Sequence, residues 1–182
     1  MNEISEPRTR TRTIVVFAML FAVFGAVVLF AYFATFSRPV TTVILVRHAE
    51  KNLEPMNQDP DLTAAGFARA EEIARMFNGA GINTIFATQY KRTQQTVKPL
   101  SDRTGVPVTL LQSKDTGALV QRIQTDLRGQ TIFVAGHNNT VPAIASALSG
   151  ESFSTIPDAE YDNLFIVTIY RFGKAKVLKL KY

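Results

Sequence analysis

Two short apolar runs, each followed directly by a histidine, most constrain the fold of this chain. Residues 43–48 read VILVRH and residues 131–137 read TIFVAGH. Continuous apolar runs rich in β-branched residues are typical of strands buried on both faces of a parallel sheet. Ligands of such sheets bind just beyond the carboxyl ends of the strands. Because the chain has only two histidines, His48 and His137, their positions predict one shared site at that edge of the sheet.

The rest of this region alternates predicted strands with predicted helices. Strands are predicted at Thr42–Val46, Thr84–Ala87, Val106–Leu111, Thr131–Ala135, Leu164–Tyr170 and Lys176–Leu180. Helices are predicted at Thr63–Phe77, Thr93–Arg103, Gly117–Leu127 and Val141–Leu148. Strand–helix alternation predicts an α/β domain with a mainly parallel sheet and helices on both faces. The last two strands are expected to form an antiparallel hairpin whose lysines mark a solvent-facing edge.

Two of the predicted helices carry further signals. Thr63 is expected to cap the first helix, whose apolar face is formed by Phe67, Ala70, Ile73, Ala74 and Phe77. Pro99 lies inside the second helix, and its ring is expected to kink or shorten that helix.

Residues 14–36 form an uncharged run of 23 residues, IVVFAMLFAVFGAVVLFAYFATF. As a helix this run is about 34 Å long, enough to cross a hydrocarbon core of about 30 Å. A cleaved signal peptide is the main alternative, but its apolar core is usually roughly 7–15 residues long and ends at a small-residue cleavage site. This run is longer and lacks such a site, so we expect one N-terminal transmembrane helix that acts as an uncleaved signal anchor.

The flanking arginines predict the orientation of this helix. Three precede the run and one follows it closely: Arg8, Arg10 and Arg12, and then Arg38. The positive-inside rule therefore predicts a cytoplasmic N-terminus and a periplasmic or otherwise extracytoplasmic domain. We divide the chain into a cytoplasmic segment (1–13), a transmembrane anchor (14–36), a linker (37–41) and one domain (42–182).

The charge balance limits the partners of the domain. Four of the 20 basic residues and two of the 15 acidic residues precede residue 41, which leaves the domain a mild positive excess. Such an excess suits a small anionic substrate. Without an aromatic–basic recognition motif it gives no indication of nucleic-acid binding. The absence of cysteine is compatible with any compartment.

Polar side chains at the predicted strand ends can form a phosphate site. They are Arg47 and His48 after the first strand, Thr88 and Arg92 after the second, Asp115 after the third and His137 after the fourth. Arginine binds phosphate bidentately and stays charged. A neutral imidazole can attack phosphorus and hold the phosphoryl group covalently. No metal ion is expected, because two histidines without a clustered pair of carboxylates do not form a metal cage.

Four motifs at these positions resemble those of the histidine phosphatase superfamily, which has the phosphoglycerate mutase-like fold. Residues 45–50 (LVRHAE) resemble its R-H-G/A signature, and residues 62–66 (LTAAG) resemble its L-T-x-x-G helix start. Residues 88–96 (TQYKRTQQT) resemble its S-x-x-x-R-A-x-Q-T segment, and residues 136–138 (GHN) resemble its second G-H motif. The likeness covers essentially all of residues 42–182.

The resemblance implies a role for each of these residues. His48 is expected to be the nucleophile that becomes phosphohistidine, and Arg47 and Arg92 to bind the phosphate oxygens. His137 is expected to donate to the phosphoryl oxygens in the transition state. Thr88 keeps the hydroxyl of the serine that the family often has there, so it can support the site through a hydrogen bond. The resemblance implies no cofactor.

Asp115 is predicted to be the general acid, because family members that have one usually carry a Glu or Asp after the third strand. The alternative is that Asp115 caps the helix that follows it. Structural roles are expected for the other aromatic and acidic candidates, with Phe153, Tyr161 and Phe165 in the core and Asp59 and Asp61 shaping a turn.

Three kinds of function remain open at this point. The first is a membrane-anchored phosphatase that hydrolyses phosphomonoesters outside the cytoplasm. Its partner is expected to be a small phosphorylated substrate or an envelope phosphate such as lipopolysaccharide core heptose phosphate, by analogy with a related periplasmic branch. The similarly small phosphohistidine phosphatases instead act on proteins.

The second is a phosphoglycerate mutase-like phosphotransferase, which the lack of a sizeable insertion over the site disfavours. The third is a non-catalytic domain that binds phosphorylated ligands, which the intact arginine and histidine motifs disfavour.

Overall fold

The computed structural model describes residues 7–36, 40–53, 56–171 and 173–182. The chain divides into two compact units, Met1–Arg38 and Pro39–Tyr182. The linker prediction falls mostly on residues 37–39, which lie outside the described residues.

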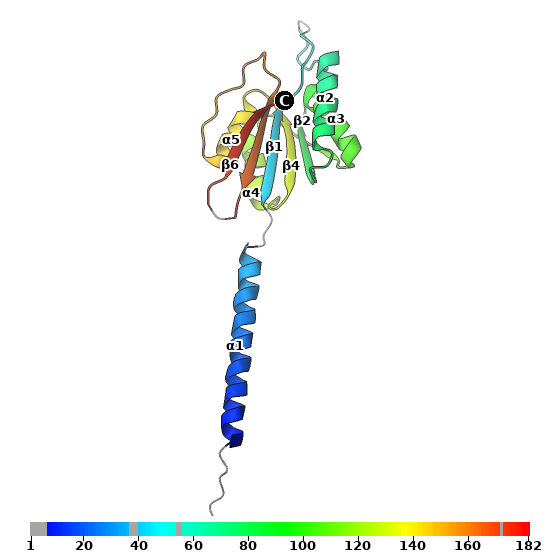
Figure 1. Ribbon diagram of the computed structural model, residues 1–182. Coiled ribbons are helices and arrows are strands. Elements are labelled where there is room, and N and C mark those ends of the chain that lie inside the picture. The colour runs from blue at the N-terminus through cyan, green and yellow to red at the C-terminus, as the bar shows by residue number, and fades with distance from the viewer. Residues whose placement is uncertain (1–6, 37–39, 54–55, 172) are drawn as a thin grey trace, which may run out of the picture. The chain divides into compact units, whose positions relative to one another are not determined.

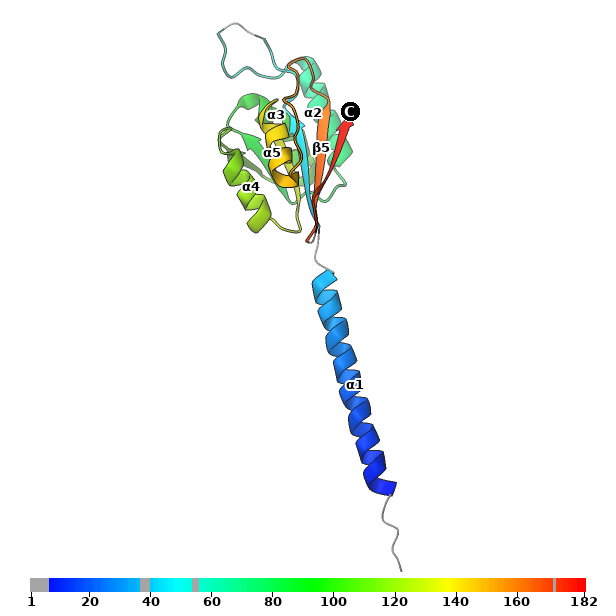
Figure 2. The ribbon, with the colours of Figure 1, turned by 90° about the vertical axis from the view of Figure 1, so that its left-hand side faces the viewer.

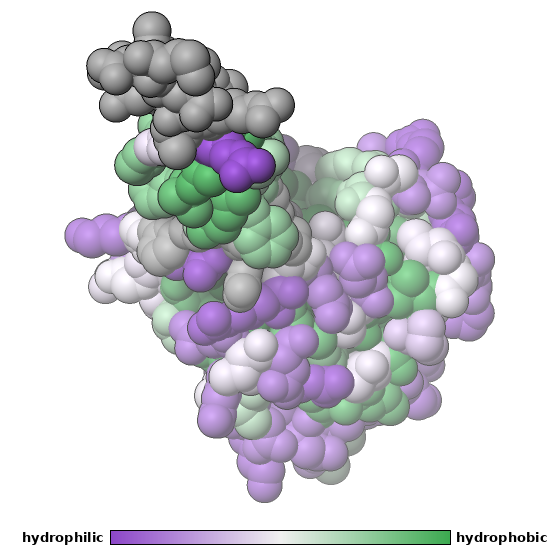
Figure 3. Space-filling view, turned by 90° about the horizontal axis from the view of Figure 1, so that it is seen from below, coloured by the Kyte–Doolittle hydropathy of each residue, from purple (hydrophilic) through white to green (hydrophobic). Residues whose placement is uncertain are grey.

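The described residues of the first unit form the helix α1 (Pro7–Phe36). Within it, Arg12–Phe33 is a stretch of 22 residues with a mean hydropathy of 2.9, and none of it is buried. Its atoms are mostly hydrophobic in Figure 3, whereas the face of the second unit turned to the viewer mixes hydrophilic and hydrophobic residues. By length and composition, α1 is able to cross a membrane.

The second unit is built on one six-stranded sheet (Figure 1), with the strand order β3-β2-β4-β1-β5-β6. Its strands are β1 (Thr41–Arg47), β2 (Thr84–Thr88), β3 (Val108–Leu111), β4 (Thr131–Gly136), β5 (Asn163–Ile169) and β6 (Lys176–Lys181). The neighbours β1, β4, β2 and β3 are parallel. The hairpin of β5 and β6 adds two antiparallel strands beside β1, and β6 is an edge strand, as predicted.

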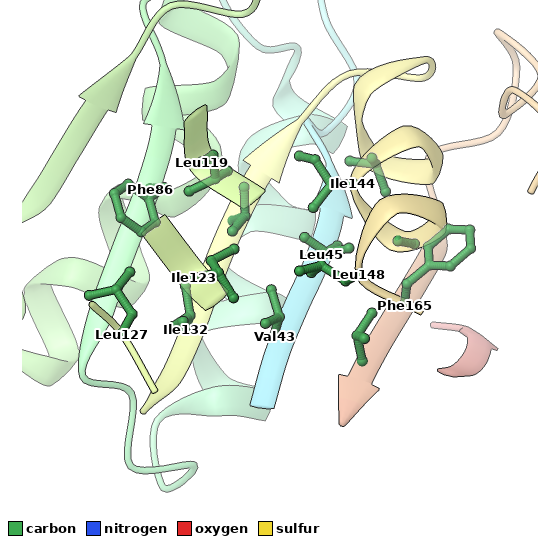
Figure 4. Packing of buried hydrophobic residues seen from close by; sticks show 14 of the residues in the cluster. Val43, Leu45, Phe86, Leu119, Ile123, Leu127, Ile132, Ile144, Leu148 and Phe165 are labelled. Carbon is green, nitrogen blue, oxygen red and sulfur yellow. The ribbon is translucent and has the colours of Figure 1, made fainter. Parts of the chain in front are cut away.

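Helices cover both faces of this sheet (Figure 2), which confirms the predicted α/β class. The helices α4 (Thr116–Thr125) and α5 (Thr140–Ser149) pack on one face, and α2 (Ala64–Phe77) and α3 (Lys91–Thr104) pack on the other. Side chains of successive strand residues point to opposite faces. Val43 and Leu45 of β1 therefore contact the α4–α5 layer in Figure 4, and Ile44 and Val46 contact the α2–α3 layer.

Two helix predictions need correction. Thr63 caps α2 as expected, but Phe67 is 46% exposed rather than buried. The buried face of α2 runs through Gly66, Ala70, Ile73, Ala74 and Phe77. Since one residue corresponds to a turn of about 100° around a helix, Phe67 lies well to the side of Gly66. Pro99 does not shorten α3, which continues to Thr104. The buried residues Val97 and Leu100 hold this helix on the sheet on either side of the proline.

The sheet register brings the two histidine motifs together. In the parallel pair β1–β4, Arg47 lies opposite Gly136, and the backbone N–H of His48 donates to the carbonyl of Gly136 at 2.9 Å. A Cβ atom on Gly136 would lie 2.8 Å from Thr140 Oγ1, so the close approach of α5 requires glycine here. The carboxyl ends of β1 and β4 thus place His48 and His137 side by side.

Candidate functional site

A cavity of about 850 Å³ opens at the carboxyl ends of the parallel strands. Its lining includes Arg47, His48, Arg92 and His137, four of the six residues predicted from the sequence. The ring centroids of the two histidines are 5.6 Å apart. The structure therefore joins two strand ends and the first turn of α3 in one polar pocket.

His48 is oriented by its own backbone neighbour. Its side chain is almost fully buried, at 3% exposed, and Nδ1 lies 2.8 Å from the carbonyl oxygen of Ala49. A carbonyl oxygen only accepts, so Nδ1 carries the proton and Nε2 of the neutral ring keeps its lone pair. Burial lowers the pKa of His48 to about 3, and the charges of Arg92 and Arg47 act in the same direction. His48 is therefore a neutral imidazole with its nucleophilic nitrogen free at neutral pH.

His137 is held by a side chain instead. Its Nε2 lies 3.0 Å from the hydroxyl oxygen of Thr88, at the end of β2. Burial lowers the pKa of His137 to about 4, with further lowering by Arg92, Arg47 and Lys51. The hydrogen bond predicted for Thr88 is therefore made to the second histidine.

The loop before β5 fixes Arg47. One guanidinium nitrogen, Nη1, donates to the carbonyl oxygens of Pro157, Asp158 and Glu160 at 2.8–3.0 Å. The Tyr161 ring lies 4.3 Å from the guanidinium carbon, within cation–π range. Tyr161 also lines the cavity, so the expectation that it is a core residue is wrong. The three hydrogen bonds of Nη1 and the Tyr161 ring together hold the guanidinium in one orientation.

Arg92 is fixed in a similar way, by a tyrosine ring and a carboxylate. The Tyr90 ring lies 4.2 Å from its guanidinium carbon, and the Asp59 carboxylate lies 3.7 Å from Nη1. The same Asp59 oxygen accepts the backbone N–H of Lys91 at the start of α3. Asp59 thus holds both the Arg92 side chain and the backbone at the start of α3. Burial lowers the pKa of Arg92 from its ordinary value, and the guanidinium nevertheless stays charged.

Both arginines keep a donor without a partner. Among the described residues, the buried side-chain nitrogen and oxygen atoms that lack a hydrogen bond are Arg47 Nε and Arg92 Nε. A buried, unsatisfied charged donor is costly, and such exceptions in native structures are often explained by an absent ion. Two of them at one cavity indicate an anion site.

Other residues of the four motifs support the loop after His48. Thr96 accepts the backbone N–H of Ala49 at 2.9 Å. Gln95 accepts the backbone N–H of Leu62, at the start of the L-T-x-x-G motif. A Cβ atom on Gly66 would lie 2.2 Å from the Glu50 carbonyl oxygen, so α2 can approach this loop only with glycine there. These motifs act as a scaffold for the histidine.

The structure does not bring Asp115 into this cavity. Asp115 lies exposed at the start of α4 and lines a separate, much smaller cavity with Thr88. It occupies the N-cap position, but its side chain makes no capping hydrogen bond. Among the described residues, the carboxylate that lines the main cavity is Asp158, which lies 3.6 Å from Arg47 and accepts from Asn138 at 2.8 Å. Sequence reasoning missed Asp158 because no motif marks it.

The residues that the structure describes contain no group of three or more His, Cys, Asp or Glu side chains able to hold a metal ion. The basic side chains that line the cavity can offset the charge of an anion there; they are Arg47, Arg92, Lys51 and Lys114.

A profile of the histidine phosphatase superfamily (branch 1) matches residues 43–113, which contain Arg47, His48, Thr88 and Arg92. This stretch of the chain is therefore similar to the histidine phosphatase superfamily. Its sequence is also 35% identical over 89 residues to Probable phosphoglycerate mutase GpmB of Enterobacter sp. (strain 638). That match covers 44% of this chain and 41% of the length of the relative.

Solved histidine phosphatase structures share the fold of the second unit. The protein histidine phosphatase SixA complexed with tungstate superimposes with a TM-score of 0.63 at 18% identity, covering 77% of this chain and 96% of SixA. The mycobacterial glucosyl-3-phosphoglycerate phosphatase superimposes with a TM-score of 0.61 at 10% identity, covering 79% of this chain and 98% of that one. At these identities the likeness establishes the phosphoglycerate mutase-like fold.

Proposed function

We propose that this chain is a phosphatase that hydrolyses phosphomonoesters through a phosphohistidine on His48. One observation carries the proposal: two arginines present buried, unpartnered Nε–H donors at the cavity that holds a pair of neutral histidines. A phosphate group supplies the acceptors that these donors lack.

The geometry around His48 supports the first chemical step. The Nε2 lone pair attacks phosphorus, and the bond between phosphorus and the leaving oxygen breaks as the P–N bond forms. Arg47 and Arg92 offset the charge that spreads over the three phosphoryl oxygens. The Nδ1–H bond to Ala49 stays in place and stabilises the positive charge that the ring gains.

A water molecule completes the cycle. It attacks phosphorus, the P–N bond breaks, and its proton leaves to a base or to solvent, which returns His48 as a neutral imidazole with inorganic phosphate beside it. The leaving oxygen of the first step needs a proton, and we compare two carboxylates as its donor, Asp115 and Asp158. Asp115 follows the third strand as in related enzymes, whereas Asp158 lines the cavity.

The substrate that we propose is a small phosphorylated molecule or an envelope phosphate. We also propose that α1 is an uncleaved anchor, since its apolar run is long and unburied and follows the arginines of its first turns. The domain then lies on the outer side of the cytoplasmic membrane. Because the structural neighbour SixA is a protein histidine phosphatase, a phosphohistidine protein is the second candidate substrate.

The test of the activity uses the full chain purified in detergent micelles. It should hydrolyse a generic aryl phosphate in excess chelator, and Arg103→Ala, on the outer side of α3, should leave the rate unchanged. If activity is lost in chelator and restored by a divalent ion, phosphate binding by the arginines alone is contradicted. Absence of hydrolysis with every aryl and alkyl ester, together with retained phosphate binding, would favour the non-catalytic domain.

The test of location uses spheroplasts of cells that express the full chain. Added protease should digest residues 40–182 while cytoplasmic markers survive. Full protection of this unit would place it in the cytoplasm and favour a signalling protein as substrate. Release of a shortened soluble form by osmotic shock would show that the apolar segment is cleaved.

A further inference from the structure

Thr93 lies behind the second histidine and outside the cavity. Its side chain is completely buried in the first turn of α3. Its hydroxyl oxygen lies 2.9 Å from the hydroxyl oxygen of Thr88, 2.8 Å from the carbonyl oxygen of Tyr90 and 3.1 Å from that of Thr88. The family segment S-x-x-x-R-A-x-Q-T has alanine at this position, so the hydroxyl is a feature of this chain.

Counting donors gives one arrangement of protons that satisfies this cluster. A threonine hydroxyl has one proton, and a carbonyl oxygen only accepts. Thr93 is within 2.8 Å of the Tyr90 carbonyl, and donation to it leaves the Thr93 oxygen free to accept. The Thr88 hydroxyl then donates to Thr93, so the Thr88 oxygen accepts from His137 Nε2 at 3.0 Å. All four groups are satisfied in this arrangement.

We infer that Thr93 is a positioning residue that, through Thr88, holds resting His137 as the tautomer with its proton on Nε2. The other ring nitrogen, Nδ1, then carries a lone pair, and no described residue bonds to it. His137 lines the cavity, and a lone pair repels a phosphate oxygen. His137 therefore takes up a proton on Nδ1 when phosphate binds, and only then donates to the phosphoryl group.

The surroundings of His137 explain why proton uptake waits for the ligand. Positive charge faces the ring from Arg47 at the end of β1, from Lys51 in the loop after it and from Arg92 in α3. The other titratable groups around it are His48, Tyr90 and, on the far side of Asn138, Asp158. Burial and these cations both disfavour an imidazolium when no phosphate is bound, in line with the low pKa of His137. The negative charge of a bound phosphate dianion offsets these cations and favours the imidazolium form of His137.

The tautomer can be read directly, because the chain has only two histidines and both lie at the site. Full-length protein in detergent micelles, labelled with ¹⁵N-histidine and purified without a histidine tag, should give two neutral imidazoles at neutral pH. We expect His48 to be protonated on Nδ1 and His137 on Nε2. Protonation of resting His137 on Nδ1, or on both nitrogens, would overturn the inference.

Variants of Thr93 test its part in this arrangement. Thr93→Val removes the acceptor of the Thr88 proton and keeps the branched shape, so the His137 signals should shift toward a mixture of tautomers. Thr93→Ser should restore the wild-type spectrum. The matched control is Thr104→Val, since Thr104 also bonds a carbonyl in α3 but lies at its other end. A wild-type spectrum for Thr93→Val would contradict the role of Thr93.

Proton uptake by His137 is measured with inorganic phosphate as the ligand. This part of the inference rests on the proposed function. Calorimetric titrations in buffers of different ionisation enthalpy should show about one proton taken up per phosphate above the second pKa of phosphate, and His137 should become an imidazolium in the ¹⁵N spectrum. Binding without proton uptake would overturn this part. Absence of phosphate binding would contradict the proposed function, while the resting spectrum still decides the role of Thr93.

Discussion

The two histidines of this chain end equivalent strands, yet the structure holds them differently. His48 donates from Nδ1 to the backbone carbonyl of the next residue, whereas His137 bonds through Nε2 to a side-chain hydroxyl. A backbone carbonyl accepts only, so it fixes the His48 tautomer under all conditions. A hydroxyl can donate or accept, so the tautomer of His137 depends on what lies behind Thr88.

This difference separates two tasks. A nucleophile needs a lone pair in place before the substrate arrives, and the Ala49 carbonyl ensures that on Nε2 of His48. A proton donor needs a proton at the right time, and with Nε2–H held by Thr88 the Nδ1 atom of His137 can take up a proton when the ligand binds. Burial lowers the pKa of both rings, which keeps both neutral in the empty site.

The largest expected effect is the loss of the nucleophile. His48→Gln should lower kcat by about 10⁴-fold or more, because the covalent route is removed. His137→Gln should cost only about 10²–10³-fold, the usual effect of removing one donor to the transition state. Steady-state rates with an aryl phosphate measure both. Equal losses in the two variants would remove the proposed difference between the histidines.

The next largest effect is the loss of the general acid that protonates the leaving oxygen. The two candidates for this role are Asp115 and Asp158. Replacing the true general acid by asparagine should slow alkyl phosphates by about 10²–10⁴-fold and leave aryl phosphates, whose leaving groups need no proton, nearly unchanged. The sequence predicts this selective loss for Asp115→Asn, whereas the lining of the cavity favours Asp158. If Asp158→Asn shows it instead, the carboxylate in the cavity is the acid and Asp115 has only a structural role at α4.

Loss of a phosphate contact comes third. Arg92→Ala should weaken transition-state binding by about 2–5 kcal/mol, the range for truncating one partner of a buried charge pair. Arg92→Lys should recover only part of this, because lysine lacks the planar pair of donors. The measurement is kcat/KM, with Arg103→Ala on the exposed part of α3 as the control. An Arg92→Ala variant with wild-type kcat/KM would exclude a phosphate contact.

The smallest effect is on stability as a function of pH. Both folded pKa values, about 3 and about 4, lie below the unfolded value of 6.5. Between about pH 5 and 6.5 the unfolded chain therefore binds more protons, and the free energy of unfolding should fall as the pH falls, by at most about 1.4 kcal/mol per pH unit for each histidine.

Thermal unfolding of the full chain in detergent micelles should show a smaller pH dependence in His137→Gln than in the wild type. The window above pH 5 avoids most carboxylate titration. An unchanged pH dependence would mean that His137 is charged in the folded state.

The sequence predicted the elements of the site that depend on local pattern. Buried strands, glycines and histidines at strand ends are visible in short windows, and so the sheet and the pairing of His48 with His137 followed. The contacts of Arg47 with residues 157–160 join positions more than 100 residues apart, and no pattern marks them. Tyr161 was assigned to the core for the same reason.

Thr93 illustrates a second limit of sequence reasoning. A threonine in the first turn of a helix is an ordinary residue, and its importance arises only where β2 and α3 place it against Thr88. Pro99 shows the reverse case, since a strong local signal for a shorter helix is overridden by the buried residues on either side of it.

The most direct test of the central claim is to locate the phosphoryl group on the enzyme. Full-length protein in detergent micelles is mixed with ³²P-labelled substrate, quenched in alkali within the first turnover, digested and analysed by mass spectrometry. We predict an acid-labile phosphoryl group on His48, attached at Nε2, that still forms in His137→Gln and is absent from His48→Gln. A phosphoryl group on His137, or turnover without any phosphohistidine, would contradict the account.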